Sequence, residues 1–134
     1  MIGCEPIVAV VDDDLSVRRG LERLLRSAGY RVETFSSARE FLACAGSRWP
    51  SCLLLDVSMP GQSGLRLYDD LVARGQTIPV IFITGHGDAA MAARAMKGGA
   101  ADFLSKPFDG KVLLRAVEQA TAKSNRQKDS PSVR

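Results

Sequence analysis

The sequence predicts an α/β protein: one domain whose five-stranded parallel sheet, in the order 2-1-3-4-5, is covered by helices on both faces. Two observations support this fold class. Short apolar runs alternate along the chain with segments of helical periodicity, a pattern typical of parallel strands joined by crossover helices. The 134 residues are also enough for a single core, and no internal repeat is visible. The prediction is a three-layer, doubly wound (βα)5 domain.

Five segments are expected to be strands, at residues 7–11, 30–35, 52–56, 78–83 and 102–105. The first and third are apolar almost throughout, which indicates strands buried on both faces. The second alternates apolar and polar residues. The fourth has Pro79 near its start, where a missing backbone donor is tolerated.

Five helices are expected between and after these strands. The first shows apolar side chains at the spacing of one helix face, at Val17, Leu21, Leu24, Leu25 and Ala28, and should end at Gly29. Ser37-Ala-Arg-Glu40 has the form of a capping box that opens a short second helix. The remaining three are expected from Gly64 to about Arg74, from Asp88 to Lys97, and from Asp109 to about Lys123.

The net charge of +3 comes from the end of the chain. Residues 123–134 contain four basic groups and one acid, whereas acids and bases balance in residues 1–122. The absence of excess positive charge in residues 1–122 argues against a nucleic-acid-binding surface there. We therefore expect a domain at 1–122 and a flexible basic linker or tail at 123–134, and DNA binding only through an output domain that this chain does not contain.

Neither a membrane span nor a secreted protein is expected. No apolar run approaches the roughly 18 residues that a span requires, and the amino terminus lacks the pattern of a signal peptide. Cys4, Cys44 and Cys52 are odd in number and show no C-x-x-C spacing. We expect free thiols in a reducing cytoplasm, with Cys44 and Cys52 buried.

Polar side chains follow four of the predicted strands where each strand ends: Asp12-Asp13-Asp14, Asp56, Thr84 and Lys106. In an open α/β sheet, ligands bind beyond the carboxyl ends of the strands, at the point where strand order reverses. Carboxylates brought together there repel one another, and Mg²⁺ or Mn²⁺ relieves the repulsion. Asp56 could then attack phosphorus as a nucleophile, while Lys106 and Thr84 contact the phosphoryl oxygens.

With these residues in place, the chain resembles the receiver domains of bacterial two-component response regulators, a CheY-like superfamily with a flavodoxin-like fold. The matching features are the acidic triplet, the context Leu55-Asp56-Val-Ser-Met-Pro60 with Gly64, Thr84, and Lys106-Pro107. The resemblance spans about residues 6–122. The runs around His86, Met96 and Lys106 are similar to the FixJ-like branch, whose receivers usually precede a helix-turn-helix output domain.

The resemblance implies a role for each matching residue. A histidine kinase would phosphorylate Asp56, with Asp13, Asp56 and the backbone carbonyl of Ser58 binding Mg²⁺ directly and Asp12 acting through water. Thr84 and Lys106 would contact the phosphoryl group. Phe103 would be the aromatic switch residue, and Lys106-Pro107 a cis peptide.

The implied protein is a cytoplasmic signalling switch rather than a metabolic enzyme, since its own phosphorylation and dephosphorylation are slow. Phosphorylation would alter the surface formed by the helix at 88–97, the strand at 102–105 and the last helix, for a partner, a second copy or a DNA-binding output domain. The third acid of the triplet is often Glu in such motifs, whereas here it is Asp14, which would only cap the first helix. Ser58 and His86 occupy positions that tune dephosphorylation in the family.

Three other functions are weighed against this one. Asp12-Asp-Asp14-Leu-Ser16 also fits the motif of haloacid-dehalogenase-type phosphatases, with Asp12 as nucleophile and Asp14 as acid/base. That assignment leaves Asp56 without a role and lacks a cap domain. A pseudo-receiver that serves only as an interaction module conflicts with the intact polar set. A flavin-binding protein would need a phosphate-cradling loop where three acids stand.

Overall fold

The computed structural model describes residues 7–44, 49–57, 64–84, 89–106 and 108–129. Its five strands form one parallel sheet in the order β2-β1-β3-β4-β5, as predicted from the sequence. The strands are β1 Ile7–Val11, β2 Arg31–Phe35, β3 Cys52–Asp56, β4 Val80–Thr84 and β5 Asp102–Ser105. The fourth strand begins after Pro79, two residues later than predicted, and the second begins one residue later, at Arg31.

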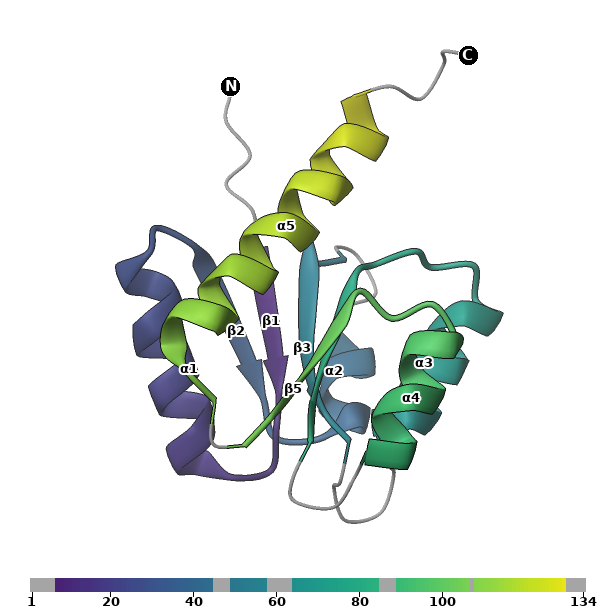
Figure 1. Cartoon of the computed structure of the whole chain (residues 1–134), viewed down its shortest axis with the longest axis horizontal. Helices are drawn as coiled ribbons and strands as arrows, with labels where there is room; N and C mark the ends of the chain where they lie inside the picture. Colours follow the sequence, from purple (N-terminus) through teal and green to yellow (C-terminus); the bar gives the residue numbers. More distant parts are fainter. Residues whose placement is uncertain (1–6, 45–48, 58–63, 85–88, 107, 130–134) are drawn as a thin grey trace.

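Five helices cover the sheet (Figure 1). They are α1 Leu15–Ser27, α2 Ala38–Cys44, α3 Gly64–Ala73, α4 Ala89–Lys97 and α5 Gly110–Asp129. Side chains of α1 and α5 pack with one face of the sheet, and those of α2 and α3 with the other. The result is the three-layer arrangement that the alternating pattern predicted.

The core is divided between these two faces because successive strand residues point to opposite sides. On β1, Val8 and Val10 belong to the cluster beneath α1 and α5, whereas Ala9 and Val11 belong to the one beneath α2 and α3. All five residues of β1, β3 and β4 are buried, as expected for central parallel strands.

The ends of α1 follow the signals in the sequence. The Asp14 side chain accepts hydrogen bonds from the backbone N–H groups of Ser16 and Val17, which caps the amino terminus. At the other end Gly29 has a φ of +95°, and its N–H donates to the Arg26 carbonyl. Because that φ is unfavourable for residues with a Cβ, glycine ends the helix here in a Schellman motif.

The carboxyl end of α4 is held by a tyrosine of α3. The Tyr68 hydroxyl donates a hydrogen bond of 3.0 Å to the carbonyl of Gly98, the residue that follows α4. The Tyr68 ring packs edge-on against Phe82 of β4, with 5.5 Å between ring centroids. This contact links α3, α4 and the centre of the sheet.

Two expectations about the surface were wrong. The last helix does not end near Lys123: α5 continues to Asp129, so residues 123–129 of the expected flexible tail are helical, while 130–134 lie outside the described residues. A helix already anchored by packed residues adds one hydrogen bond per residue as it extends, even through a polar sequence. Cys44 is exposed, because it is the last residue of α2 and faces away from the core.

No helix in the part of the chain that the structure describes is long and apolar enough to span a membrane. The described cysteines, Cys44 and Cys52, are both free thiols, and Cys52 is fully buried as predicted. Cys4 lies outside the described residues.

The two described thiols should differ sharply in reactivity. Burial raises the pKa of the Cys52 thiol to about 12, and the backbone hydrogen bond of Leu53 lowers it only in part. Since the thiolate is the reactive form, we expect iodoacetamide at pH 8 to label Cys44 readily and Cys52 only after denaturation. Peptide mapping by mass spectrometry measures this, and labelling of Cys52 in the native protein would contradict the packing of β3.

Replacing Gly20 by alanine should stabilise the protein. Gly20 lies within α1 without a positive φ, and a Cβ built on it meets nothing within 4 Å. Alanine restricts the unfolded chain and favours the helix, so we expect the free energy of unfolding to rise by about 0.5–1 kcal/mol. Urea unfolding followed by circular dichroism tests this, and a loss of stability would show that Gly20 has a structural role.

Candidate functional site

The carboxyl ends of the central strands bring the predicted residues together at one edge of the sheet, the lower edge in Figure 1. Asp12 directly follows β1, Asp56 ends β3, Thr84 ends β4 and Lys106 directly follows β5. In register, Asp56 pairs with Ile83, so these four positions lie within one or two residues of the same level. The parallel topology therefore collects groups that are far apart in the sequence.

Three carboxylates form the centre of this site. Asp12, Asp13 and Asp56 each offer an oxygen, and the three oxygens lie within 4.8 Å of one another. Asp12 and Asp56 are 1% and 4% exposed, while Asp13 is exposed. A cluster of carboxylate oxygens, partly open to water, fits a hard divalent cation such as Mg²⁺, which binds one or two carboxylates and retains water ligands. The donor set therefore agrees with the predicted metal.

Lys106 places a positive charge on this cluster. Its Nζ lies 3.4 Å from Asp12 Oδ2 and 3.7 Å from Asp56 Oδ2. Partial burial would lower the pKa of Lys106, but the charges of Asp12 and Asp56, the hydrogen bond to Asp12 and the charge of Asp14 together raise it. Lys106 is therefore a stable cation, able to approach negatively charged oxygens.

Backbone contacts fix Asp12 in place. The N–H of Asp14 donates to Asp12 Oδ1 at 2.9 Å, and the N–H of Asp12 donates to the Phe35 carbonyl of β2 at 3.1 Å. The Arg18 guanidinium donates to the Asp12 carbonyl at 2.7 Å. The sequence analysis missed Arg18. The one sequence feature that could have drawn attention to Arg18 is its charge: it is a basic residue near the start of a helix, where acidic residues are more favourable.

Thr84 reaches the predicted edge, but its hydroxyl faces β5. The side chain is 2% exposed, and Oγ1 donates to the Leu104 carbonyl at 3.5 Å. Phe103, on the same strand as Leu104, is 37% exposed. Contact between Thr84 and a phosphoryl group remains a prediction, as does the switching of Phe103.

Gly64 supports Asp56 from the start of α3. A Cβ built on Gly64 would clash with the Asp56 carbonyl and approach Leu55 Cγ to 3.1 Å. The Gly64 N–H also donates to the Val57 carbonyl at 3.0 Å. Only a residue without a side chain allows this close approach of α3 to the end of β3.

An apolar groove of about 330 Å³ lies beside the site. Its walls are α1 and the segment after β5, with Lys106 at the border between the groove and the acids. The lining residues are Val17, Gly20, Leu21, Leu24, Lys106 and Phe108. Through Lys106, which pairs with Asp12 and Asp56, the groove adjoins the acidic cluster.

Three predicted positions lie outside the described residues: Ser58, with its proposed carbonyl ligand, Pro107, with its proposed cis peptide, and His86. Their roles stay predictions.

The comparisons with known proteins identify this arrangement. A family profile described as the response regulator receiver domain matches residues 8–118. The chain belongs to the response regulator receiver family. It is 52% identical over 124 residues to nodulation protein W of Bradyrhizobium diazoefficiens, covering 92% of this chain. It is 46% identical over 128 residues to the transcriptional regulatory protein FixJ of Azorhizobium caulinodans, covering 93% of this chain.

Solved structures agree with the receiver domain. The response regulator StyR superposes with a TM-score of 0.88 at 48% identity, covering 96% of this chain and 65% of that chain. The crystal structure of FixJ-N gives 0.83 at 41% identity, with coverages of 90% and 96%. The receiver chain spans only 55% of the length of nodulation protein W and 61% of FixJ.

The haloacid-dehalogenase alternative is wrong, because the receiver profile covers the acidic triplet, Asp56 and Lys106 in one continuous match. In the receiver domain Asp14 serves as the cap of α1, and Asp12 is buried against Lys106. An Asp14 carboxylate that is engaged in capping α1 is not placed to serve as the acid/base partner of a phosphatase.

Proposed function

We propose that Asp56 accepts a phosphoryl group from a histidine kinase in a Mg²⁺-dependent reaction. The observation that carries this proposal is the position of Asp56, whose carboxylate shares a 4.8 Å cluster with Asp12 and Asp13 and lies 3.7 Å from Lys106. A lone buried carboxylate would be costly. One surrounded by a cation and by potential metal ligands is suited to stay ionised and to act as a nucleophile.

In the transfer, an Asp56 carboxylate oxygen forms a bond to phosphorus while the phosphorus–nitrogen bond of the kinase phosphohistidine breaks, and the histidine leaves with the bonding electrons and takes up a proton. Asp13, Asp56 and the Ser58 carbonyl would hold Mg²⁺, with Asp12 acting through water, and the ion would supply positive charge to offset that of the incoming phosphoryl group. Lys106 adds a second cation from the β5 side. The same site would hydrolyse the phosphoryl group slowly.

The groove beside Lys106 supports a protein as phosphoryl donor. Its apolar lining from α1 and Phe108 meets Lys106, which pairs with Asp12 and Asp56, so a partner seated there would lie next to the phosphoacceptor. Such a surface suits a sensor histidine kinase in the cytoplasm. The relatives FixJ and TdiR, both called transcriptional regulatory proteins, suggest that the response controls transcription through an output domain.

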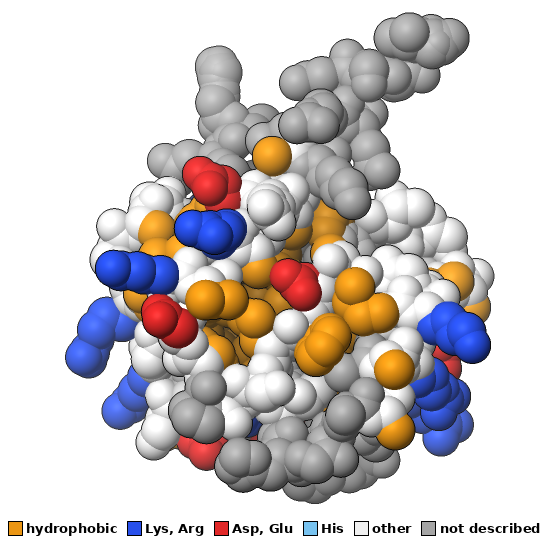
Figure 2. All heavy atoms as spheres, in the orientation of Figure 1, with side chains coloured by type: hydrophobic (Ala, Val, Ile, Leu, Met, Phe, Trp, Pro, Cys, Tyr) orange, Lys and Arg blue, Asp and Glu red, His pale blue; other side chains and the backbone are white. Residues whose placement is uncertain are grey.

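Phosphorylation would change the face formed by α4, β5 and α5. Once phosphorylated, Asp56 would attract the Thr84 hydroxyl away from the Leu104 carbonyl, leaving space for Phe103 to turn inward. Figure 2 shows apolar side chains gathered near the centre of the face it presents, with an acidic side chain among them. Large apolar side chains that are exposed among the described residues of α4, β5 and α5 are Met96, Phe103 and Val112. A second copy of the chain could bury them in a phosphorylation-dependent homodimer.

Intact mass spectrometry after incubation with acetyl phosphate and Mg²⁺ tests the proposal. The wild type should gain about 80 Da, the mass of one phosphoryl group replacing a proton, and Asp56→Asn should gain nothing. Removing the metal with EDTA should suppress the gain. An adduct that persists in Asp56→Asn and disappears in Asp12→Asn would move the nucleophile to β1 and overturn the assignment.

A further inference from the structure

The backbone carbonyl of Asp12 needs a hydrogen-bond donor from outside the sheet. The register between β1 and β2 ends at the pair Val11 and Phe35, and Asp12 lies one residue beyond it. Its N–H still reaches the Phe35 carbonyl, but among the described residues no strand pairing supplies a donor for its own carbonyl. Asp12 is 1% exposed, so an unpaired carbonyl there would be costly.

Arg18 supplies that donor. Its Nη1 lies 2.7 Å from the Asp12 carbonyl oxygen, a short charge-assisted hydrogen bond between the first turns of α1 and the end of β1. The contact spans the connection that carries Asp13 and Asp14. Together with the Asp14 cap and the Asp14 N–H bond to Asp12 Oδ1, it closes a small ring of contacts around this connection.

We propose that Arg18 is a positioning residue for the metal site: it holds the connection between β1 and α1 so that the Asp12 and Asp13 carboxylates face Asp56. This inference rests on the proposed Mg²⁺-dependent function. Among the described residues Arg18 forms no ion pair with a carboxylate, and its hydrogen bond is to the Asp12 backbone, through which it would act.

The charge and the position of Arg18 have opposite effects on cation binding, which makes the proposal testable. A positive charge near the acids should weaken Mg²⁺ binding, so removing it should strengthen binding if charge were its only effect. If Arg18 positions the acids, removing it should weaken binding. Loss of groups that orient metal ligands typically costs 10- to 100-fold in metal affinity.

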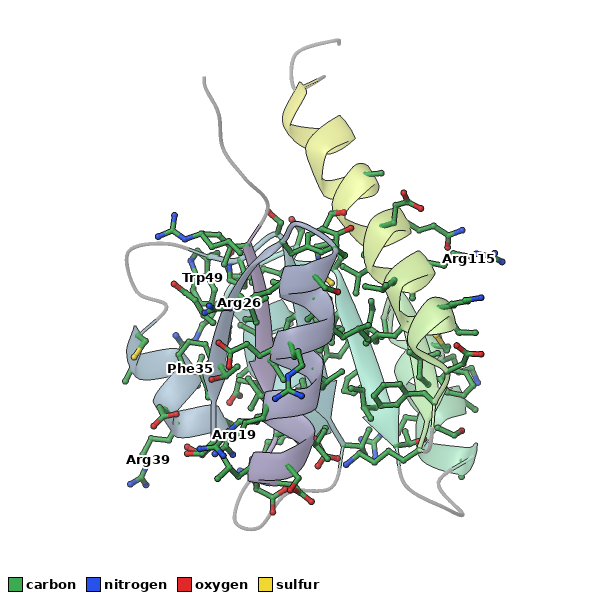
Figure 3. The ribbon with its side chains drawn as sticks, turned by 90° about the vertical axis from the view of Figure 1, so that its left-hand side faces the viewer. Arg19, Arg26, Phe35, Arg39, Trp49 and Arg115 are labelled. Atoms are coloured by element: carbon green, nitrogen blue, oxygen red, sulfur yellow. The ribbon has the colours of Figure 1, made fainter. Side chains whose placement is uncertain are left out.

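The experiment is isothermal titration calorimetry of the unphosphorylated protein with Mg²⁺. We expect Arg18→Met to bind about tenfold more weakly than the wild type. The matched control is Arg19→Met: Arg19 is the next residue of α1, exposed on its outer side (Figure 3), so its removal subtracts the same charge without touching the Asp12 carbonyl. Arg19→Met should bind Mg²⁺ as tightly as the wild type or slightly more tightly.

Two further measurements separate positioning from a loss of folding. Arg18→Lys keeps the positive charge, but the lysine side chain is shorter and ends in a compact ammonium group. We therefore expect its Mg²⁺ affinity to lie between those of Arg18→Met and the wild type. The rate of labelling by acetyl phosphate should show a raised Mg²⁺ requirement in Arg18→Met but a nearly normal rate at saturating Mg²⁺. A variant that merely unfolded would lose the saturating rate as well.

The outcomes distinguish this inference from the proposed function. Mg²⁺ affinity in Arg18→Met that equals or exceeds that of the wild type, as in Arg19→Met, would overturn the positioning role alone. If Arg18→Met does not fold, Arg18→Lys provides the test. Wild-type Mg²⁺ affinity in Arg18→Lys would overturn the positioning role, and weakened affinity would support it. A wild type that takes up no Mg²⁺ would overturn the proposed function and this inference with it.

Discussion

Replacing Lys106 by methionine should lower the free energy of unfolding by about 2–3 kcal/mol at pH 7 in Mg²⁺-free buffer. Lys106 is the cation next to the buried carboxylates of Asp12 and Asp56, at 3.4 and 3.7 Å. Removing one partner of a buried ion pair costs about 3–5 kcal/mol. Because the Lys106 side chain is 31% exposed, water screens part of the interaction, and we expect a loss below that general range or at its lower end.

Urea unfolding followed by circular dichroism measures the loss. The matched control is Lys111→Met, which removes an exposed lysine at the start of α5 and should change stability little. Millimolar Mg²⁺ should recover much of the loss in Lys106→Met, since a cation among the acids replaces the missing charge. Equal stability of the two lysine variants without Mg²⁺ would show that Lys106 is merely solvated.

The dependence on pH follows from the raised pKa of Lys106. A lysine with a higher pKa in the folded than in the unfolded state contributes its full stability below the unfolded value of about 10.5. That contribution is lost as the pH rises through the folded value. The difference between wild type and Lys106→Met should therefore stay constant from pH 7 to about 10 and shrink only at more alkaline pH.

Gly64→Ala should damage both the fold and the phosphoacceptor. The added methyl group would clash with the Asp56 carbonyl, which is backbone and cannot rotate away, and would press on Leu55. We expect a loss of about 1–3 kcal/mol, as for other overpacked sites. To relieve the clash, α3 or the end of β3 must shift, so labelling of Asp56 by acetyl phosphate should also slow at saturating Mg²⁺.

Gly20→Ala is the control for this change, since it adds the same methyl group where nothing lies within 4 Å. The free energy of unfolding measured with urea should fall in Gly64→Ala and rise in Gly20→Ala. If Gly64→Ala were as stable as the wild type and labelled at the same rate, the close approach between α3 and Asp56 would have no consequence.

The sequence predicted those parts of the fold that depend on local pattern. Apolar runs and helical spacing specified all five strands and all five helices, since burial on one or both faces imposes the periodicity directly. The site followed from the same prediction. Once the strand ends were known, the parallel topology required Asp12, Asp56, Thr84 and Lys106 to share one edge.

The remaining features depend on tertiary geometry that no short pattern encodes. Whether the Thr84 hydroxyl faces the acids or the Leu104 carbonyl is a choice of side-chain rotamer between two available acceptors. The Arg18 contact joins a helix to the Asp12 carbonyl, which lies one residue beyond the end of the β1–β2 register at Val11. Cys44 is exposed because α2 ends there, a boundary that sequence patterns locate poorly.

The single tryptophan gives this domain an optical probe away from its chemistry. Trp49, labelled in Figure 3, precedes β3 and packs edge-on against Phe41, with 6.1 Å between ring centroids. Asp56 is the last residue of that strand, at its other end. Its emission should follow the packing of α2 against the sheet and therefore global unfolding. Neither Mg²⁺ nor a phosphoryl group on Asp56 would touch the indole, so a change in emission on phosphorylation would report a rearrangement transmitted through the core that Trp49 packs against.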